Sequence, residues 1–163
     1  LGLEHMQSID NIFTEKEQKY LLDCSNRVIV TKEVAKKHGA PVNEADDYWS
    51  PDVRKIPHFK FALDKLLKLT EQKLGKNLKI SNAWLTKTNG KKFKFHSHDE
   101  CNYSVVYYLQ TTEKVNSGTE FELYGLKKAK QNSILIFDSR LKHRTPVYSS
   151  KENRITLVLD INI

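Results

Sequence analysis

The residues best suited to chemistry are histidines and carboxylates near the middle of the chain. The stretch HSHDE holds His96 and His98, one residue apart, followed by Asp99 and Glu100. In an extended strand, residues i and i+2 point to the same face, so the two imidazoles would aim at one point, as metal ligands must. A third histidine, His143, stands at the entry to another predicted strand. Because neutral imidazole binds iron, zinc, copper and nickel, this pattern favours a metal site over isolated surface or core histidines.

Two ligand sets are compatible with this spacing. In the first, His96, His98 and His143 bind the metal. In the second, His98 and Glu100 form a His-x-Glu pair, with His96 placed behind the ligands. The second set leaves only two residues before the next predicted strand, which is little room for the chain to cross between sheets. We therefore favour the first, with Asp99 kept as a carboxylate that could reach the metal directly or through water.

The elements that must position these residues change type along the chain. The N-terminal half is expected to be helical, and a capping box at Thr14–Glu17 opens a helix over about residues 15–26. Ser50-Pro51 is expected to begin a second helical stretch, which Pro57 divides into a short turn and a longer helix that ends at a C-terminal cap, Gly75. From residue 78 onward, strand patterns separated by turn residues predict a β-sandwich or barrel. These expected strands are LKISNAWLTK, KFKFHSH, YSVVYYLQ, TEFELY, SILIFD, a piece near KHRTPV, and RITLVLDINI, with a hairpin turn at Asn89-Gly90. One short strand, VIVTK at 28–32, is expected earlier, within the helical half.

The last predicted strand has two distinct faces. One face is apolar, which suits cover by the N-terminal helices: Ile155, Leu157, Leu159 and Ile161. The other is mixed and suits a lined cavity: Arg154, Thr156 and Val158. Helices followed by strands, with one sheet covered, indicate an α+β fold. The loops at about residues 37–50 and 113–117 are expected to shape the mouth of the pocket.

Length and composition bound the remaining possibilities. We expect one domain of 163 residues, with a helical support over 6–77, a β core over 78–163, and residues 1–5 as a cloning remnant. Hydrophobic residues make up 39% and charged residues 29%, which excludes a disordered chain. No apolar run approaches the ~20 residues of a membrane span, no signal peptide is visible, and the two cysteines are far apart, so we expect a reduced, cytoplasmic protein. The net charge of +7 comes from scattered lysine pairs, so nucleic-acid binding is not expected.

Several short motifs, in order, carry a resemblance to a known family. They are His96-Ser97-His98, Ser104–Leu109 (SVVYYL), Gly118–Phe121 (GTEF), Ile134–Phe137, His143 and Arg154. With them, the chain from about residue 81 to 163 resembles the Fe(II)/2-oxoglutarate-dependent oxygenases, in particular a small, prolyl-hydroxylase-like bacterial and phage branch with the motif H-x-H, a short turn, then S-x-V-Y-Y-L. The chain departs from most of that family, which has His-x-Asp or His-x-Glu as its first ligand pair.

The resemblance implies a fold, an activity and a site. The fold would be a double-stranded β-helix of the jelly-roll or cupin type, with N-terminal helices packed on one sheet. The activity would be hydroxylation of a C–H bond in a protein residue such as proline, or in a small molecule, with release of succinate and CO2 and with ascorbate as an auxiliary reductant. Fe(II) would be held by His96, His98 and His143. Arg154, Tyr108 and Thr156 would bind 2-oxoglutarate, since a guanidinium pairs with a carboxylate through two parallel hydrogen bonds.

Two alternatives stay open at this point. A cupin-like enzyme with three histidine ligands would not use 2-oxoglutarate, and its activity would survive the loss of Arg154. A basic, non-catalytic binding module would hold no stoichiometric metal, and its binding to nucleic acid would depend steeply on salt. The identity of the substrate and the oligomeric state do not follow from the sequence.

Overall fold

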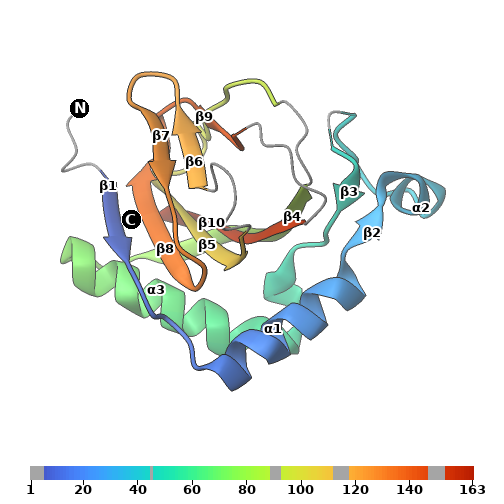
Figure 1. The fold of residues 1–163 in the computed structure, drawn as a ribbon, viewed down its shortest axis with the longest axis horizontal. Helices are drawn as coiled ribbons and strands as arrows, with labels where there is room; N and C mark the ends of the chain where they lie inside the picture. Colours follow the sequence, from blue (N-terminus) through green and yellow to red (C-terminus); the bar gives the residue numbers. More distant parts are fainter. Residues whose placement is uncertain (1–5, 45, 89–92, 112–117, 147–152) are drawn as a thin grey trace.

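The structure is a computed structural model that describes residues 6–44, 46–88, 93–111, 118–146 and 153–163 (Figure 1). Its helices are α1 (Glu15–Val28), α2 (Lys32–Lys37), η2 (Val53–Lys55), η3 (Pro57–Phe59) and α3 (Lys60–Leu74). Its strands are β1 (Met6–Ile9), β2 (Val30–Thr31), β3 (Tyr48–Trp49), β4 (Lys79–Thr88), β5 (Tyr103–Gln110), β6 (Gly118–Phe121), β7 (Gly125–Lys128), β8 (Ser133–Asp138), β9 (His143–Arg144) and β10 (Arg154–Asn162).

The largest sheet has five antiparallel strands in the order β1-β8-β5-β10-β4. A second sheet of three antiparallel strands has the order β7-β6-β9. Figure 1 shows α1 and α3 lying along the five-stranded sheet on the side away from the three-stranded sheet. This arrangement of helices with antiparallel sheets confirms the α+β expectation.

The strand β10 lies between β5 and β4 in the large sheet and has the two faces that its sequence predicts. Its odd-numbered residues, Ile155, Leu157, Leu159 and Ile161, belong to the main hydrophobic core, together with Phe59 and Leu66 from the helical layer. Val106, Tyr108, Phe121 and Phe137 form a smaller core, which joins β5 and β8 to β6. The sheet therefore buries one face under the helices and turns the other toward β6.

The ends of the two long helices follow from local sequence. Thr14 caps α1: its hydroxyl accepts a hydrogen bond from the Glu17 backbone N–H, and the Glu17 side chain accepts one from the Thr14 N–H. Gly75 ends α3 in the left-handed conformation at φ 66°, which a residue with a Cβ adopts only with strain. Both signals were read correctly from the sequence.

Several expected elements differ in the structure. The stretch KFKFHSH is not a strand: among its described residues, only His96 pairs, in an isolated bridge with His143. The segment TEFELY leaves strand geometry after Phe121, and β7 follows as a separate strand. Strand β1 and helix α2 were not foreseen, and the expected turn at residues 89–90 lies outside the described residues. No helix within the described parts of the chain is long and apolar enough to cross a membrane.

Candidate metal centre

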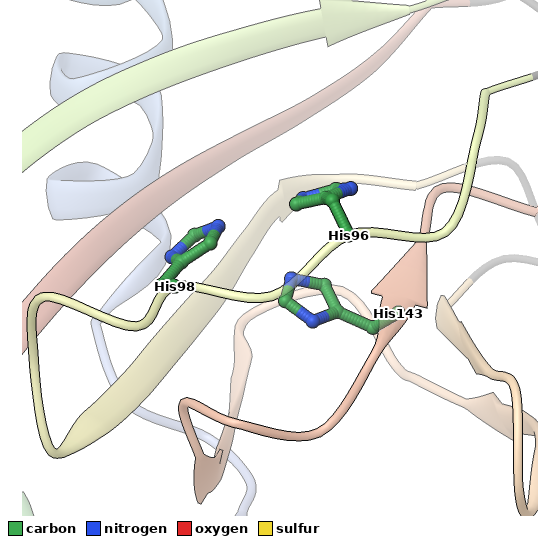
Figure 2. A group of neighbouring side chains, drawn as sticks. All are labelled: His96, His98 and His143. Carbon is green, nitrogen blue, oxygen red and sulfur yellow. The ribbon is translucent and has the colours of Figure 1, made fainter.

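Three histidine side chains from two distant segments meet at one place (Figure 2). The ring centroids of His96 and His143 lie 4.5 Å apart, those of His98 and His143 5.1 Å, and those of His96 and His98 5.3 Å. One nitrogen from each ring lies within 4.8 Å of the other two. Two nitrogens bound to one ion by bonds of about 2.1 Å are at most about 4.2 Å apart, so the three rings can bind a single ion with at most a small adjustment.

Backbone hydrogen bonds fix the approach of the two segments. The His96 N–H donates to the His143 carbonyl at 3.0 Å, and the His143 N–H donates to the His96 carbonyl at 2.8 Å. Two residues further on, the His98 N–H donates to the Ser139 carbonyl at 2.8 Å. His143 itself lies in β9, opposite Phe121 of β6. The convergence of the imidazoles therefore depends on main-chain pairing between the segment before β5 and the segment around β9.

The Nδ1 atom of each imidazole, the ring nitrogen nearer the backbone, lies close to an oxygen atom. For His143 the partner is the Leu141 carbonyl at 2.8 Å, for His98 an oxygen of Asp160 at 2.8 Å, and for His96 the Lys94 carbonyl at 3.3 Å. Because these oxygens are acceptors, the matching tautomer carries its proton on Nδ1 and leaves a lone pair on Nε2. This is how metal-binding histidines are usually oriented.

Two of the rings are held in the neutral form that binds metals: His143 by burial, and His96 by partial desolvation beside its neighbours, although the residue remains exposed at the surface. His143 is 6% exposed and lies against Phe137, with ring centroids 4.8 Å apart. Desolvation lowers the pKa of His143 to about 3, although its hydrogen bond to the Leu141 carbonyl opposes this change. Desolvation also lowers the pKa of His96. Both imidazoles are thus neutral at neutral pH, and a metal ion would not have to displace a proton from them.

The structure separates the two ligand sets that the sequence left open. Asp99 and Glu100 are exposed, and Asp99 accepts a hydrogen bond from the Ser97 hydroxyl at 2.9 Å. Among the described residues, the groups with metal-compatible spacing are two, and neither includes Asp99 or Glu100. The geometry brings together the three histidines and leaves the His-x-Glu pair apart.

The second group shares His98 and adds Cys101 and Asp160. The Cys101 thiol lies within hydrogen-bond reach of the carbonyls of His98 (3.6 Å) and Tyr103 (3.5 Å), and burial raises its pKa to about 11. A protonated thiol is a poor metal ligand, so this group is better understood as support for His98. Asp160 was missed as a site residue, although it continues the face of β10 that carries Arg154, Thr156 and Val158. That alternation was the available signal.

Arg154, at the start of β10, points inward and is 4% exposed. Its guanidinium donates to the Gly118 carbonyl at 2.8 Å and to the Thr145 hydroxyl at 3.3 Å, and lies 5.5 Å from the centre of the Tyr108 ring. Tyr108 belongs to the same small core as Phe137, which lies against His143, so Arg154 is on the same side of the sheet as the imidazoles. A permanent cation is therefore held inside the fold beside the candidate metal centre.

The two hydroxyl residues expected beside Arg154 lie on the same inner face. Thr156 is opposite Tyr108 of β5 and opposite Thr86 of β4, and its hydroxyl is hydrogen-bonded to that of Thr86. The Tyr108 hydroxyl is hydrogen-bonded to that of Thr119 at 2.6 Å. Burial raises the pKa of Tyr108, so its phenol stays protonated and able to donate a hydrogen bond.

A cavity of about 340 Å³ opens beside this centre. Trp84, one of its lining residues, lies 5.6 Å from His98 between ring centroids. The segment at residues 37–50 contributes Trp49 and Asp46 to the wall, and the Asp46 charge acts on His96. The other segment expected at the pocket mouth, 113–117, lies outside the described residues.

The chain resembles known proteins in its fold and not in its sequence. No family model and no curated sequence matches it. Solved structures do: the viral collagen prolyl hydroxylase vCPH of Paramecium bursaria Chlorella virus-1, in its 2-oxoglutarate complex, is 17% identical with a TM-score of 0.65, covering 98% of this chain and 97% of that one. EctD from S. alaskensis with bound iron is 14% identical with a TM-score of 0.71, covering 97% and 72%. An oxidoreductase of the 2-oxoglutarate-Fe(II) oxygenase family from Burkholderia pseudomallei is 10% identical with a TM-score of 0.67, covering 97% and 84%.

The fold is that of the 2-oxoglutarate-Fe(II) oxygenases. The matches extend over nearly the whole chain, whereas the motifs quoted from the sequence cover only its second half. The mixed helix and antiparallel-sheet architecture expected from the resemblance agrees with this fold, and the helices and strands before residue 78 are part of the match.

Proposed function

We propose that this protein is an Fe(II)- and 2-oxoglutarate-dependent oxygenase that hydroxylates a C–H bond. One observation carries the proposal: three imidazoles converge with their Nδ1 atoms tied to oxygens, and a buried arginine lies on the same side of the sheet. The first arrangement suits a metal and the second suits a carboxylate of a small acid. The fold of known iron oxygenases supports the same interpretation.

His96, His98 and His143 are proposed to hold the metal. A ferrous ion in this position would supply oxygen activation, coupling decarboxylation of 2-oxoglutarate to succinate with hydroxylation of the substrate. The residues of the chain have a separate task. They hold the ligands neutral and oriented, and Phe121 and Phe137 keep water away from the inner side of His143.

Arg154 is proposed to bind the distal carboxylate of 2-oxoglutarate. Its guanidinium is anchored by the Gly118 carbonyl and stays charged at any relevant pH. Tyr108 and Thr156 are proposed to add hydroxyl contacts, because they face each other across neighbouring strands on the same face as Arg154. Together these three side chains would form a polar recess in an otherwise apolar wall.

The two sheets are proposed to form the double-stranded β-helix, within a single domain whose core covers 78–163. Residues 6–77 would then support the five-stranded sheet from outside, through α1 and α3, and would extend it through β1. The cavity beside Trp84 is proposed as the substrate pocket. Its aromatic walls suit either a proline-containing peptide, the type of substrate named for vCPH, or a small molecule.

A second candidate function has one observation in its favour. The converging group contains three imidazoles and no carboxylate, a donor set equally suited to a cupin-like metalloenzyme that works without 2-oxoglutarate. The two candidates differ in what they require of Arg154.

The test is succinate formation from 2-oxoglutarate by protein reconstituted with Fe(II), with and without ascorbate and candidate peptides. Arg154→Met should retain stoichiometric iron and lose 2-oxoglutarate-dependent turnover, since it keeps the length of the side chain but not its charge. Arg140→Met is a matched control, because Arg140 is exposed and paired with Asp138 on the loop before β9. Iron-dependent activity that persists in Arg154→Met would support the cupin-like enzyme, and absence of succinate under all conditions would contradict the oxygenase.

A further inference from the structure

We propose that Asp160 is the carboxylate of this metal centre, acting as a positioning residue through His98 and not as a ligand. The inference rests on the proposed metal site and goes beyond it, because Asp160 has no place in the ligand set. An oxygen of Asp160 lies 2.8 Å from His98 Nδ1, the nitrogen on the inner side of the ring. The carboxylate therefore holds the proton on Nδ1 and presents Nε2 to the ion.

The burial and the neighbours of Asp160 favour its contact with His98. The residue is 3% exposed and lies in β10, opposite Ser104 of β5. The Ser104 hydroxyl lies 3.4 Å from the same His98 nitrogen. A carboxylate buried this deeply is costly unless it is hydrogen-bonded, and His98 provides the bond. The Trp84 ring also packs near the imidazole, with ring centroids 5.6 Å apart, and further restricts its orientation.

The charge of the proposed metal centre explains what a carboxylate beside His98 would contribute. Three neutral imidazoles leave the full double charge of a ferrous ion in place, whereas the usual triad of two histidines and one carboxylate neutralises half of it. Asp160 supplies one negative charge behind His98, on the far side of the imidazole from the ion. A carboxylate bonded to a ligating imidazole makes that ligand more basic, and its loss typically weakens metal binding by about 10- to 100-fold.

The experiment measures metal affinity, independently of turnover. Asp160→Asn keeps the side chain's shape and removes its charge, and its dissociation constant for Co(II) should rise by about 10- to 100-fold. Asp99→Asn is the matched control: it removes a carboxylate next to His98 in sequence but exposed, and should leave the constant unchanged. In ¹⁵N-histidine spectra of the Zn(II)-loaded protein, the Nδ1–H signal of His98 should move upfield in Asp160→Asn and stay in place in Asp99→Asn.

A double-mutant cycle with His98→Ala separates positioning from general support of the fold. If Asp160 acts through His98, Asp160→Asn should have no further effect on Co(II) affinity once His98 is alanine. An equal loss in both backgrounds, or an unchanged constant in the single variant, would overturn the inference while leaving the metal site standing. Wild-type protein that binds no Co(II) would overturn both this inference and the proposed function.

Discussion

Proton binding at His143 links the candidate site to the stability of the fold. In the unfolded chain a histidine titrates near pH 6.5, whereas burial lowers the pKa of His143 to about 3. Between pH 6.5 and pH 3, His143 is protonated in the unfolded chain but not in the folded chain. The free energy of unfolding therefore falls as the pH drops through this range. The stabilisation is complete above about pH 6.5 and declines toward pH 3, with a slope of at most about 1.4 kcal/mol per pH unit.

The share of this slope that comes from His143 can be measured in metal-free protein. Urea unfolding of chelator-treated wild type should show a midpoint that decreases from pH 7 to pH 5. His143→Gln should flatten the decrease, because glutamine does not titrate. His38→Gln should keep the wild-type slope, since His38 is exposed at the end of α2. A slope unaffected by His143→Gln would contradict the assignment.

At the same scale, the sequence predicted the histidines but not their support. Spacing alone indicated that His96 and His98 could bind the same metal ion, and the order of the motifs brought in His143 and Arg154. The partner of His98 was missed because Asp160 is 62 residues away along the chain, and only the register of β10 against β5 brings the two together. Such long-range contacts depend on strand pairing, which a single sequence does not specify.

Among the elements, those with local signals were predicted best. The helix α1 has a capping box and α3 ends at a glycine, and both signals act within one turn of chain. The stretch KFKFHSH alternates as a strand would. In the structure, however, the backbone of His96 bonds to His143 and that of His98 to Ser139, and these bonds do not continue as a regular strand pairing. Phe95 lies under the Arg144 guanidinium, 4.0 Å from the ring centre. An alternating sequence pattern indicates that a segment has one polar and one apolar face, but it does not indicate whether another strand lies beside the segment.

Asn132, just before β8, fastens the connection between β1 and α1 to the large sheet. Its side chain accepts hydrogen bonds from the Phe13 N–H and the Tyr107 hydroxyl and donates one to the Phe13 carbonyl, at 2.8–3.0 Å. Its φ is 65°, a left-handed conformation that asparagine tolerates better than alanine. Asn132→Ala should therefore lower the free energy of unfolding by about 3 kcal/mol, through unsatisfied buried groups and backbone strain.

Two further variants, measured by urea unfolding, separate the contribution of the lost hydrogen bonds from that of the backbone strain. Asn132→Gly removes the same hydrogen bonds without the strain, and should be about 1 kcal/mol less destabilising than Asn132→Ala. Asn11→Ala tests strain alone, because Asn11 also has a positive φ (55°) but is exposed. Equal stability of Asn132→Ala and wild type would show that the connection does not depend on this residue.

Over the whole molecule, the candidate metal centre lies between the two sheets. His96 and His98 precede β5 of the five-stranded sheet, whereas His143 belongs to β9 of the three-stranded sheet. The sheets are already joined by the small apolar core, by the hydrogen bonds around His143, and by those from Arg154 to Gly118 and between Tyr108 and Thr119. An ion bound by all three histidines would add a further link. Since the unfolded chain lacks this arrangement, metal binding should stabilise the fold as a whole.

The size of the effect follows from mass action. At a free metal concentration 100 times the dissociation constant, the gain is about 2.7 kcal/mol, which for a chain of this length corresponds to a rise in Tm of about 5–10 °C. Calorimetry with Ni(II), an air-stable substitute for Fe(II), should show this rise in wild type. His143→Ala should abolish it, because one sheet then contributes no ligand, and His38→Ala should retain it. A Tm that is insensitive to metal in wild type, or a rise that survives in His143→Ala, would show that the two sheets are not joined through these imidazoles.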